Sequence, residues 1–315
     1  MTRSPLFNAK TLVGLAITGA LLAACTPPEP MLKTQQHAAP ESSASVHARF
    51  VPERRDDFAF ENDMVAFRKY GPDIRSGAEN AGLDCWSKRV EYPIIDKWYK
   101  QHLDQDKSYH KDWGEGLDNY HVGSSAGCGS SALWINDEWQ GLETFMTWQI
   151  IEQTPNSVSF ALTYENEIDG DVYQETKHIR LNKGERLFSA TSQFYKNGQV
   201  AADLPVAVGI ATHDGKANVN HEVQAGFISG WEVLGDSGLG IGVLVDPRQS
   251  IRFETIGVEG EKDTGHALYV VNTDSQGKLR YYAGYGWQKA GVITSQDVWN
   301  EYLKDFATTT ARFNL

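Results

Sequence analysis

Between residues 145 and 287 lie nine short segments, and in most of them hydrophobic and polar positions alternate. The segments are residues 145–153, 157–165, 175–182, 186–195, 204–211, 228–235, 239–246, 267–273 and 278–287. Alternation with a period of two is typical of antiparallel strands that are buried on one face. Turn-forming sequences such as TPNS, NKGE and KNGQ separate the segments. Because no helical stripe intervenes, the pattern predicts an all-β fold, a large antiparallel two-sheet β-sandwich in a single domain.

Two stretches follow a helical pattern instead. The sequence SQDVWNEYLKDFA near the C-terminus is amphipathic, and its first residue, Ser295, is in the position of an N-cap. We therefore expect a short C-terminal helix. The sequence DKWYKQHL, residues 96–103, predicts a second short helix.

Residues 50–140 have little periodicity and are rich in aromatic, charged and glycine residues. A long irregular segment inside a compact domain is usually functional or disordered. Five tryptophans argue against disorder: Trp86, Trp98, Trp113, Trp134 and Trp139. We therefore expect a loop-rich N-terminal segment that packs over one face of the sandwich and builds a site there.

The N-terminus has the pattern of a secretion signal. Residues 1–24 carry Arg3, Lys10 and a short apolar run, and LLAAC at residues 21–25 resembles the lipobox of bacterial lipoprotein precursors. This predicts a lipoprotein signal peptide over residues 1–24 and a lipid anchor at Cys25; an ordinary signal peptide is the alternative. Residues 25–48 are rich in Pro, Ser, Ala and Gln, which predicts a flexible tether before a single domain at 49–315. The expected location is the cell envelope, facing the periplasm or the cell surface, with the outer membrane favoured.

Charge and cysteine content narrow the function. The chain has 41 acidic and 29 basic residues, a formal net charge of -12, which argues against nucleic-acid binding. An anionic sugar stays possible, because a few local basic residues are enough to bind it. Cys85 and Cys128 are the only cysteines besides Cys25. An oxidising compartment would allow one disulfide between them, although spacing alone does not decide the pairing.

Three early motifs suggest a family. The sequences FAFENDMVAFRKYGP, GLDCWSKRVEYPIIDKWY and YHKDWGEGLDNYHVGSSAGCGSSALW resemble the bacterial domain of unknown function 4861 family. The later ETKHIRLNKGERLF resembles the strand-turn-strand repeat of galactose-mutarotase-like proteins. Together these resemblances cover about residues 50–310. They imply a β-supersandwich with a sugar site in the concave face of its larger sheet, and a role in the breakdown of acidic polysaccharides such as pectin, alginate or ulvan. Oligosaccharide dehydration is one reaction they imply, but no catalytic motif comes with them.

The segment from residue 108 to residue 121 concentrates groups that can move protons or hold charge. These groups are His110, Lys111, Asp112, Glu115, Asp118, Tyr120 and His121. Glycines between them allow sharp turns and close approach to a ligand. We interpret the segment as a pocket wall, with a polar surface loop as the alternative. Metal binding is a third option, although the spacing matches neither a zinc signature nor an EF-hand loop, and no cofactor is predicted.

Further candidates come from predicted strands and strand ends. In FENDMVAFRKYGP, a strand would place Asn62, Arg68 and Tyr70 on one face, where Arg68 could bind a carboxylate or pair with Asp63 or Glu61. His213 and His266 lie at predicted strand ends, where binding sites are common. Tyr282 and Trp287 lie on the predicted strand LRYYAGYGW and are further candidates.

The preferred reaction is an elimination on a uronate-containing oligosaccharide, by a dehydratase or a lyase-like enzyme. Such a reaction needs a cation for the carboxylate, a base for the C5 proton and an acid for the leaving oxygen. The candidates are Arg68 or Lys111 for the carboxylate, His121 or His213 for the base, and Tyr120 or Tyr70 for the acid.

Three alternatives stay open. An epimerase or mutarotase could use His213 with Glu115. A hydrolase would need two carboxylates roughly 5–10 Å apart, drawn from Asp112, Glu115 and Asp118. A non-catalytic lipoprotein that binds glycans is the alternative outside enzymes. An acidic oligosaccharide and the membrane are the expected partners, and the sequence does not indicate the oligomeric state.

Overall fold

The computed structural model describes residues 45–75, 77, 79–249, 251–257, 261–308 and 313. These residues belong to one compact unit, Pro40–Leu315. The predicted signal peptide, the anchor Cys25 and most of the predicted tether lie outside the described residues.

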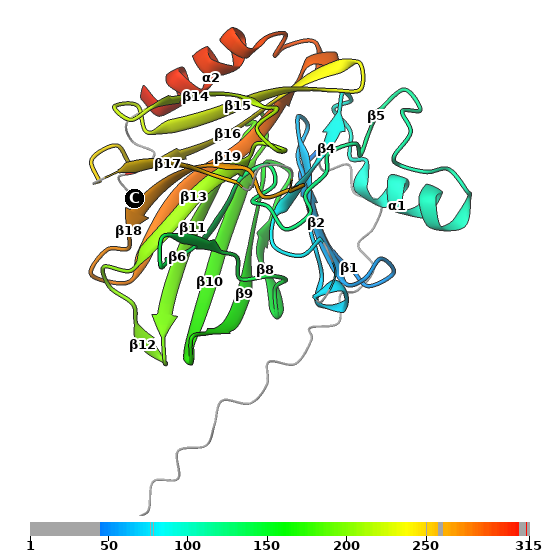
Figure 1. The fold of residues 1–315 in the computed structure, drawn as a ribbon. Helices are drawn as coiled ribbons and strands as arrows, with labels where there is room; N and C mark the ends of the chain where they lie inside the picture. The colour runs from blue at the N-terminus through cyan, green and yellow to red at the C-terminus, as the bar shows by residue number, and fades with distance from the viewer. Residues whose placement is uncertain are drawn as a thin grey trace, which may run out of the picture. The chain divides into compact units, whose positions relative to one another are not determined.

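A nine-stranded antiparallel sheet is the largest element of the fold (Figure 1). Its strand order is β14-β15-β16-β19-β11-β10-β9-β8, with β12 paired to β11. The strands are β8 (Thr147–Gln153), β9 (Ser157–Ile168), β10 (Asp171–Asn182), β11 (Leu187–Lys196), β12 (Gln199–Val200), β14 (Asn218–Glu222), β15 (Phe227–Leu234), β16 (Ser237–Val245) and β19 (Lys278–Trp287).

A five-stranded antiparallel sheet packs against one face of this large sheet. Its order is β17-β18-β13-β6-β7. The strands are β6 (Ser130–Ile135), β7 (Glu138–Gln140), β13 (Pro205–Ala211), β17 (Arg252–Ile256) and β18 (His266–Asn272). Val208 and Ile210 of β13 lie in the same buried cluster as Ile241 and Val243 of β16. The predicted all-β sandwich is therefore confirmed, and each of the nine predicted strand segments lies mostly within a strand.

The N-terminal segment is more regular than the sequence suggested. It forms a third antiparallel sheet with the order β1-β2-β3-β4-β5. Its strands are β1 (His47–Val51), β2 (Asp57–Glu61), β3 (Ala66–Lys69), β4 (Leu83–Lys88) and β5 (Gly116–Leu117). Every residue of β2, β3 and β4 is buried, so these strands do not alternate between apolar and polar positions. The periodicity that revealed the later strands was therefore missing here.

Aromatic side chains join this third sheet to the large sheet. The ring centroids of Phe58 and Phe160 are 4.6 Å apart, and those of Phe67 and Phe188 are 5.3 Å apart. A separate cluster of buried residues, which includes Trp86, packs the N-terminal sheet against helix α1 (Ile95–Asp104). The predicted packing of this segment over one face of the sandwich is thus observed, with strands in place of loops.

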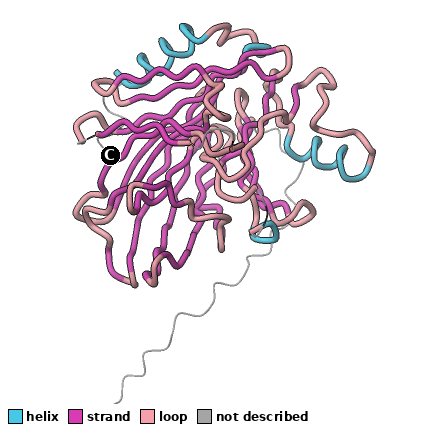
Figure 2. Tube along the Cα trace, in the orientation of Figure 1, coloured by secondary structure: helices cyan, strands magenta, loops and turns pink. Residues whose placement is uncertain are grey.

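The two helices lie at the periphery of the strands (Figure 2). Helix α2 (Gln296–Thr308) packs Trp299, Leu303 and Phe306 against the large sheet, on the face that carries Leu187 and Tyr282. The hydroxyl of Ser295 accepts a hydrogen bond from the Val298 amide at 3.3 Å, so Ser295 caps the helix as predicted. Within the described residues, no helix has the length and hydrophobicity needed to span a bilayer.

Two features refine the predicted boundaries. Strand β1 begins at His47, inside the predicted tether, and His47 Nε2 lies 3.4 Å from Asp96 Oδ2. Cys85 of β4 and Cys128, two residues before β6, form a disulfide with a Cα–Cα distance of 6.1 Å. The disulfide thus ties the N-terminal sheet to the start of the smaller sandwich sheet.

Removing this disulfide tests its contribution to stability. The bond joins residues that are 43 positions apart, so its loss frees a long loop in the unfolded chain. We expect the double variant Cys85→Ala, Cys128→Ala to lose about 2–4 kcal/mol of unfolding free energy. Urea denaturation of the variant and the wild type under the same conditions measures the difference. An unchanged midpoint and slope would show that the bond does not constrain the fold.

Candidate functional site

Three loops meet at the edge of the sandwich where β13 ends and β18 begins. We call them the loop cluster: residues 119–127, 212–217 and 261–266. The Thr212 amide donates to the Gly265 carbonyl at 2.9 Å, and the Asp263 amide donates to Asp214 Oδ1 at 3.0 Å. The first loop joins the other two through the Ala211 amide, which donates to the Gly127 carbonyl at 3.0 Å. Backbone hydrogen bonds therefore bring together segments that are far apart in sequence.

His121 is held by two carboxylates in this cluster. Its Nε2 lies 2.7 Å from Asp263 Oδ2, and its Nδ1 lies 3.5 Å from Glu79 Oε1. The shorter contact fixes the orientation of the ring and favours the tautomer with the proton on Nε2. The side chain is 43% exposed, so a ligand can reach it. His121 therefore combines a fixed ring with access to solvent, which suits a general base.

His213 is bonded on both sides to acceptors. Its Nδ1 lies 2.5 Å from Glu232 Oε2, and its Nε2 lies 2.6 Å from the carbonyl oxygen of His121. Burial lowers the pKa of His213, but the bonds to Glu232 and His121 and the charges of Glu232 and Asp263 outweigh it and raise the pKa overall. With both nitrogens donating, His213 is a positive charge in the site rather than a base.

The backbone at His213 is also unusual. His213 has a φ of 44° and Asp214 a φ of 63°, both in the left-handed region. Residues other than glycine adopt this region at an energetic cost, and such positions concentrate at functional sites. The two hydrogen bonds of the His213 ring help to hold this conformation.

Tyr120 contacts His213 and reaches a small pocket. The two ring centroids are 4.8 Å apart. Tyr120 is buried, and its hydroxyl has no hydrogen-bond partner within the part of the chain that the structure describes. Burial, together with the charges of Glu232, Asp84 and Asp263, raises the pKa of Tyr120 well above its usual value. The phenol therefore stays protonated and can act as a proton donor.

The small pocket beside Tyr120 contains about 190 Å³ of empty space. Its lining is mostly apolar, with Glu232 as its charged member. The lining residues are Tyr120, Ala217, Gly230, Glu232, Leu234, Leu239 and Ile241.

His266 also lies in the loop cluster, but both of its nitrogens are bonded to the backbone. Its Nε2 accepts from the Ala126 amide at 3.1 Å, and its Nδ1 lies 2.8 Å from the Thr264 carbonyl. Its ring stacks on Trp139 at 4.9 Å. Burial lowers the pKa of His266 to about 4. This neutral histidine joins two loops and is not placed to contact a ligand.

A buried ion triad of Arg68, Asp84 and Asp118 lies beside the cluster. Arg68 Nη2 is 2.6 Å from Asp84 Oδ2 and 3.3 Å from Asp118 Oδ2. The guanidinium also lies 5.0 Å from the ring of Tyr70. Burial raises the pKa values of Asp84 and Asp118, and Arg68 opposes the rise; the charge of Asp84 further raises the pKa of Asp118. Arg68 is thus occupied by two carboxylates inside the protein, and so is not available as the expected cation for a substrate.

Glu61 and Asp63, the other possible partners of Arg68, are bonded to other groups. Glu61 is buried, pairs with Lys88 at 2.9 Å and accepts from the amides of Ile94 and Ile95 at the start of α1. Asp63 accepts from the Gly184 amide. Neither forms the ion pair with Arg68 that the sequence allowed.

Glu79 connects the ion triad with the loop cluster. It pairs with His121, and its negative charge also raises the pKa values of Asp84, Asp118 and Tyr70. The buried hydroxyl of Tyr70 and Oδ1 of Asp84 lack hydrogen-bond partners among the described residues. Because buried polar atoms are normally paired, such atoms together indicate a functional region.

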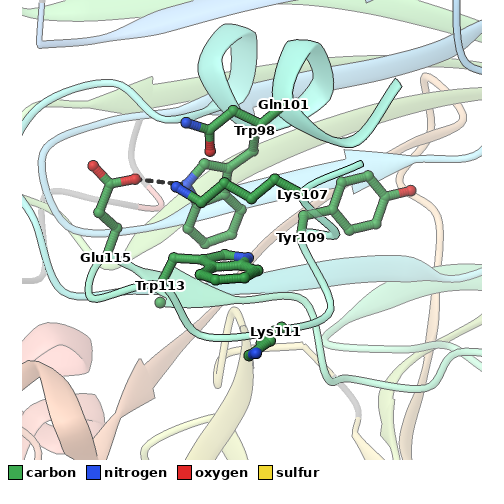
Figure 3. Close-up of a pocket in the computed structure, with 8 residues that line it drawn as sticks. Trp98, Gln101, Lys107, Tyr109, Lys111, Trp113 and Glu115 are labelled. Atoms are coloured by element: carbon green, nitrogen blue, oxygen red, sulfur yellow. Dashed lines mark hydrogen bonds between the residues drawn. The ribbon is translucent and has the colours of Figure 1, made fainter. Parts of the chain in front are cut away.

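A second pocket, which we call the aromatic pocket, lies between α1 and the loop that follows it (Figure 3). It contains about 220 Å³ of empty space. Its lining residues are Trp98, Gln101, Lys107, Tyr109, Lys111, Trp113, Glu115 and Gly116. It shares no lining residue with the pocket beside Tyr120.

The acidic residues near the aromatic pocket are paired. Glu115 accepts from Trp98 Nε1 at 3.1 Å and also bonds to Lys97 and Tyr92. Burial raises the pKa of Glu115, but these bonds outweigh it and lower the pKa overall. Asp112 pairs with Arg89 at 2.8 Å.

The predicted segment 108–121 is therefore divided between two places. Lys111 and Glu115 line the aromatic pocket, and Asp112 lies beside it. His110 is more exposed, and its Nδ1 lies 2.9 Å from the carbonyl of Asp118. Asp118 belongs to the ion triad, while Tyr120 and His121 belong to the loop cluster.

Three other candidates have structural contacts. Asn62 donates to the carbonyls of Asn182 and Glu185 and accepts from the Met64 amide, so it fixes a turn. Tyr282 packs against Phe306 of α2, on the opposite face of the large sheet. Trp287 is buried in the sandwich core, with the guanidinium of Arg89 at 5.4 Å. The structure does not bring these three to the loop cluster.

Sequence reasoning missed four acidic residues of this region: Glu79, Asp84, Glu232 and Asp263. Only Asp84 had a visible signal, because it is a single acid inside the apolar stretch GLDCW. In the described ranges, no group of three or more His, Cys, Asp or Glu residues is placed to hold a metal ion.

The fold and the site define a class: an antiparallel β-sandwich protein with a cluster of histidines and carboxylates at one sandwich edge. The chain belongs to the family described as Domain of unknown function (DUF4861), which it matches over residues 20–312. A Formosa agariphila relative called Uncharacterized protein P7 is 34% identical over 277 residues, covering 85% of this chain and 68% of that protein.

Among solved structures, the chain matches a heparinase III gene product with 12% identity and a TM-score of 0.41. A heparan sulfate lyase from Pedobacter heparinus has 11% identity and a TM-score of 0.40. These alignments cover 78% and 80% of this chain but only 36% and 37% of the solved chains, so the chain spans little more than a third of their length.

The raised pKa of His213 makes stability depend on pH. A histidine whose folded pKa exceeds its unfolded value of about 6.5 stabilises the fold fully below that pH. This contribution is lost as the pH rises through the folded pKa. We therefore expect the unfolding free energy of the wild type to fall as the pH rises from about 6.5 through the folded pKa of His213, and the fall to be smaller in His213→Gln. Urea denaturation across this range tests the difference, and equal pH dependence in both proteins would contradict it.

Proposed function

We propose that this protein is a carbohydrate-active enzyme that performs an elimination on uronate-containing oligosaccharides. The observation that carries the proposal is the convergence of His121, Tyr120 and His213 in the loop cluster. It places a carboxylate-oriented imidazole, a protonated phenol and a positive charge within one small region. An elimination beside a carboxylate needs a base, an acid and stabilisation of negative charge.

The roles follow from the contacts of each group. His121, held by Asp263, removes the proton from C5 of the uronate. The bond between C4 and its oxygen substituent breaks, a C4–C5 double bond forms, and the leaving oxygen takes the hydroxyl proton of Tyr120. The imidazolium of His213 stabilises the phenolate that this transfer leaves on Tyr120. Whether the leaving group is a hydroxyl or a sugar decides between a dehydratase and a lyase.

In this assignment neither Arg68 nor Lys111 binds the uronate carboxylate, and His213 instead supplies positive charge beside Tyr120. Arg68 is already paired with Asp84 and Asp118, and Lys111 lies in the aromatic pocket. The buried hydroxyl of Tyr70 near the ion triad has no hydrogen-bond partner among the described residues, which supports a role in holding the substrate.

The other enzymatic alternatives have less support. An epimerase would need His213 and Glu115 to act on the same sugar ring. His213 lies in the loop cluster, whereas Glu115 lines the aromatic pocket. A hydrolase would need two free carboxylates. Asp112, Glu115 and Asp118 are instead paired with Arg89, Lys97 and Arg68, respectively.

Substitution at the loop cluster tests the reaction. We expect His121→Gln and Tyr120→Phe each to lower the rate of product formation by about 10²–10⁴-fold, because each removes one proton-transfer step. The assay is mass spectrometry of saturated and unsaturated pectin, alginate and ulvan oligosaccharides after incubation with the protein. Loss of one water indicates dehydration, and cleavage with a new conjugated double bond indicates a lyase.

The matched control is His178→Gln, which changes an exposed histidine of β10 that has no part in the site. It should leave the rate unchanged. If wild-type protein alters none of these substrates, or if His121→Gln keeps full activity, the elimination is ruled out. An unchanged mass with an altered sugar NMR spectrum would point to epimerisation instead.

Lipid anchoring at Cys25 is a separate part of the proposal, and it would place the enzyme in the cell envelope. We expect the full chain made in a bacterial host to incorporate labelled palmitate, and Cys25→Ala to incorporate none. Equal label in both proteins, or none in either, would reject the anchor while leaving the proposed reaction unaffected.

A further inference from the structure

The aromatic pocket has an exposed tryptophan whose ring is already fixed. Trp113 is 47% exposed, although large aromatic residues are mostly buried in this protein. Its Nε1 donates to the carbonyl of Ser108 at 2.9 Å, which restrains the ring. A restrained aromatic face loses little freedom when a ligand stacks on it. The apolar face of a sugar ring is a ligand of this shape.

Two ammonium groups lie next to this ring. The Nζ atoms of Lys107 and Lys111 are 5.2 Å and 4.4 Å from the centroid of Trp113, and Figure 3 shows the indole between the two side chains. Within the described part of the chain, neither lysine forms an ion pair with a carboxylate. Both side chains are long and flexible, so they can move from the indole to a ligand.

The remaining charge of the pocket is compensated internally. Glu115 is the acidic residue of the lining, and its carboxylate is bonded to Lys97, Tyr92 and Trp98. The net charge presented to a ligand therefore comes from Lys107 and Lys111. An acidic protein thus presents a local positive site beside an aromatic surface.

The size of the pocket limits its occupant. The pocket has about 220 Å³ of empty space, part of which is open to solvent, so it can enclose only a small part of a ligand. It suits a single ring of a longer molecule. Gln101 adds an amide that can bond to hydroxyl groups.

From these features we infer that the aromatic pocket is a separate binding site for one uronate unit of an oligosaccharide. The sugar ring stacks on Trp113, and its carboxylate binds Lys107 and Lys111. The choice of a uronate rests on the proposed function, whereas the anionic and aromatic character of the site rests on the pocket itself. The site would hold a part of the glycan that does not react.

The test uses the indole N–H signal of Trp113 in NMR spectra of the full chain, assigned by its loss in Trp113→Phe. The probes are trigalacturonate and the neutral trisaccharide maltotriose. We expect trigalacturonate to shift this signal in a saturable way and maltotriose to leave it unchanged. The double variant Lys107→Gln, Lys111→Gln should weaken the response to trigalacturonate about tenfold. Lys304→Gln, an exposed lysine on α2, is the matched control and should have no effect.

The titration is run in the His121→Gln background, so that turnover does not consume the probe. A Trp113 signal that does not move, or that moves equally with maltotriose, overturns the inference even if the wild type is active. An unchanged affinity in the double lysine variant also overturns it. If the Trp113 signal responds as expected but the wild type forms no product, the binding site stands and the proposed reaction fails.

Discussion

The buried ion pairs of Arg68 with Asp84 and Asp118 are the constraint on which the rest of the site depends. Arg68 and Asp84 face each other across β3 and β4, and Asp118 reaches them from the loop after β5. Removing one partner of a buried pair typically costs about 3–5 kcal/mol, because the other charge stays unpaired. That is a large part of the roughly 5–15 kcal/mol that stabilises a folded domain. Asp118 is a second buried partner of Arg68, and this contact restrains its position.

Fixing Asp118 also determines where the neighbouring residues point. On its N-terminal side, the chain lines the aromatic pocket with Lys111 and Trp113. On its C-terminal side, Tyr120 and His121 enter the loop cluster, and the His121 carbonyl binds the ring of His213. The Cys85–Cys128 disulfide holds the end of this loop near the strand that carries Asp84. One polar segment thus contributes to two sites because it is held at its middle and at its end.

The sequence predicted the parts of this arrangement that depend on local pattern. Strands such as β10 and β11 alternate because one of their faces is more exposed. Strands β13 and β16 are buried almost throughout and were marked by apolar runs between turn sequences. Helix α2 shows its amphipathic stripe and its cap at Ser295. The strands β2, β3 and β4 are buried on both faces, so no alternation marked them. Likewise, chemical composition identified His121, Tyr120 and His213, but not their partners. Asp263 lies 142 residues from His121, and only the folded loops bring the two together.

The pairing of acids reconciles a net charge of -12 with the proposed site for an anionic sugar. In the segment 108–121, Asp112, Glu115 and Asp118 each have a basic partner from another part of the chain. Coulomb interactions weaken within about 10 Å in physiological salt, so distant surface acids contribute little at the pocket. The charge that acts on a ligand in the aromatic pocket is therefore that of the nearby groups. Lys107 and Lys111 make this local charge positive. Net charge therefore indicates which classes of ligand, such as nucleic acids, the protein as a whole is not suited to bind. The local pairing of acids decides what a single pocket can bind.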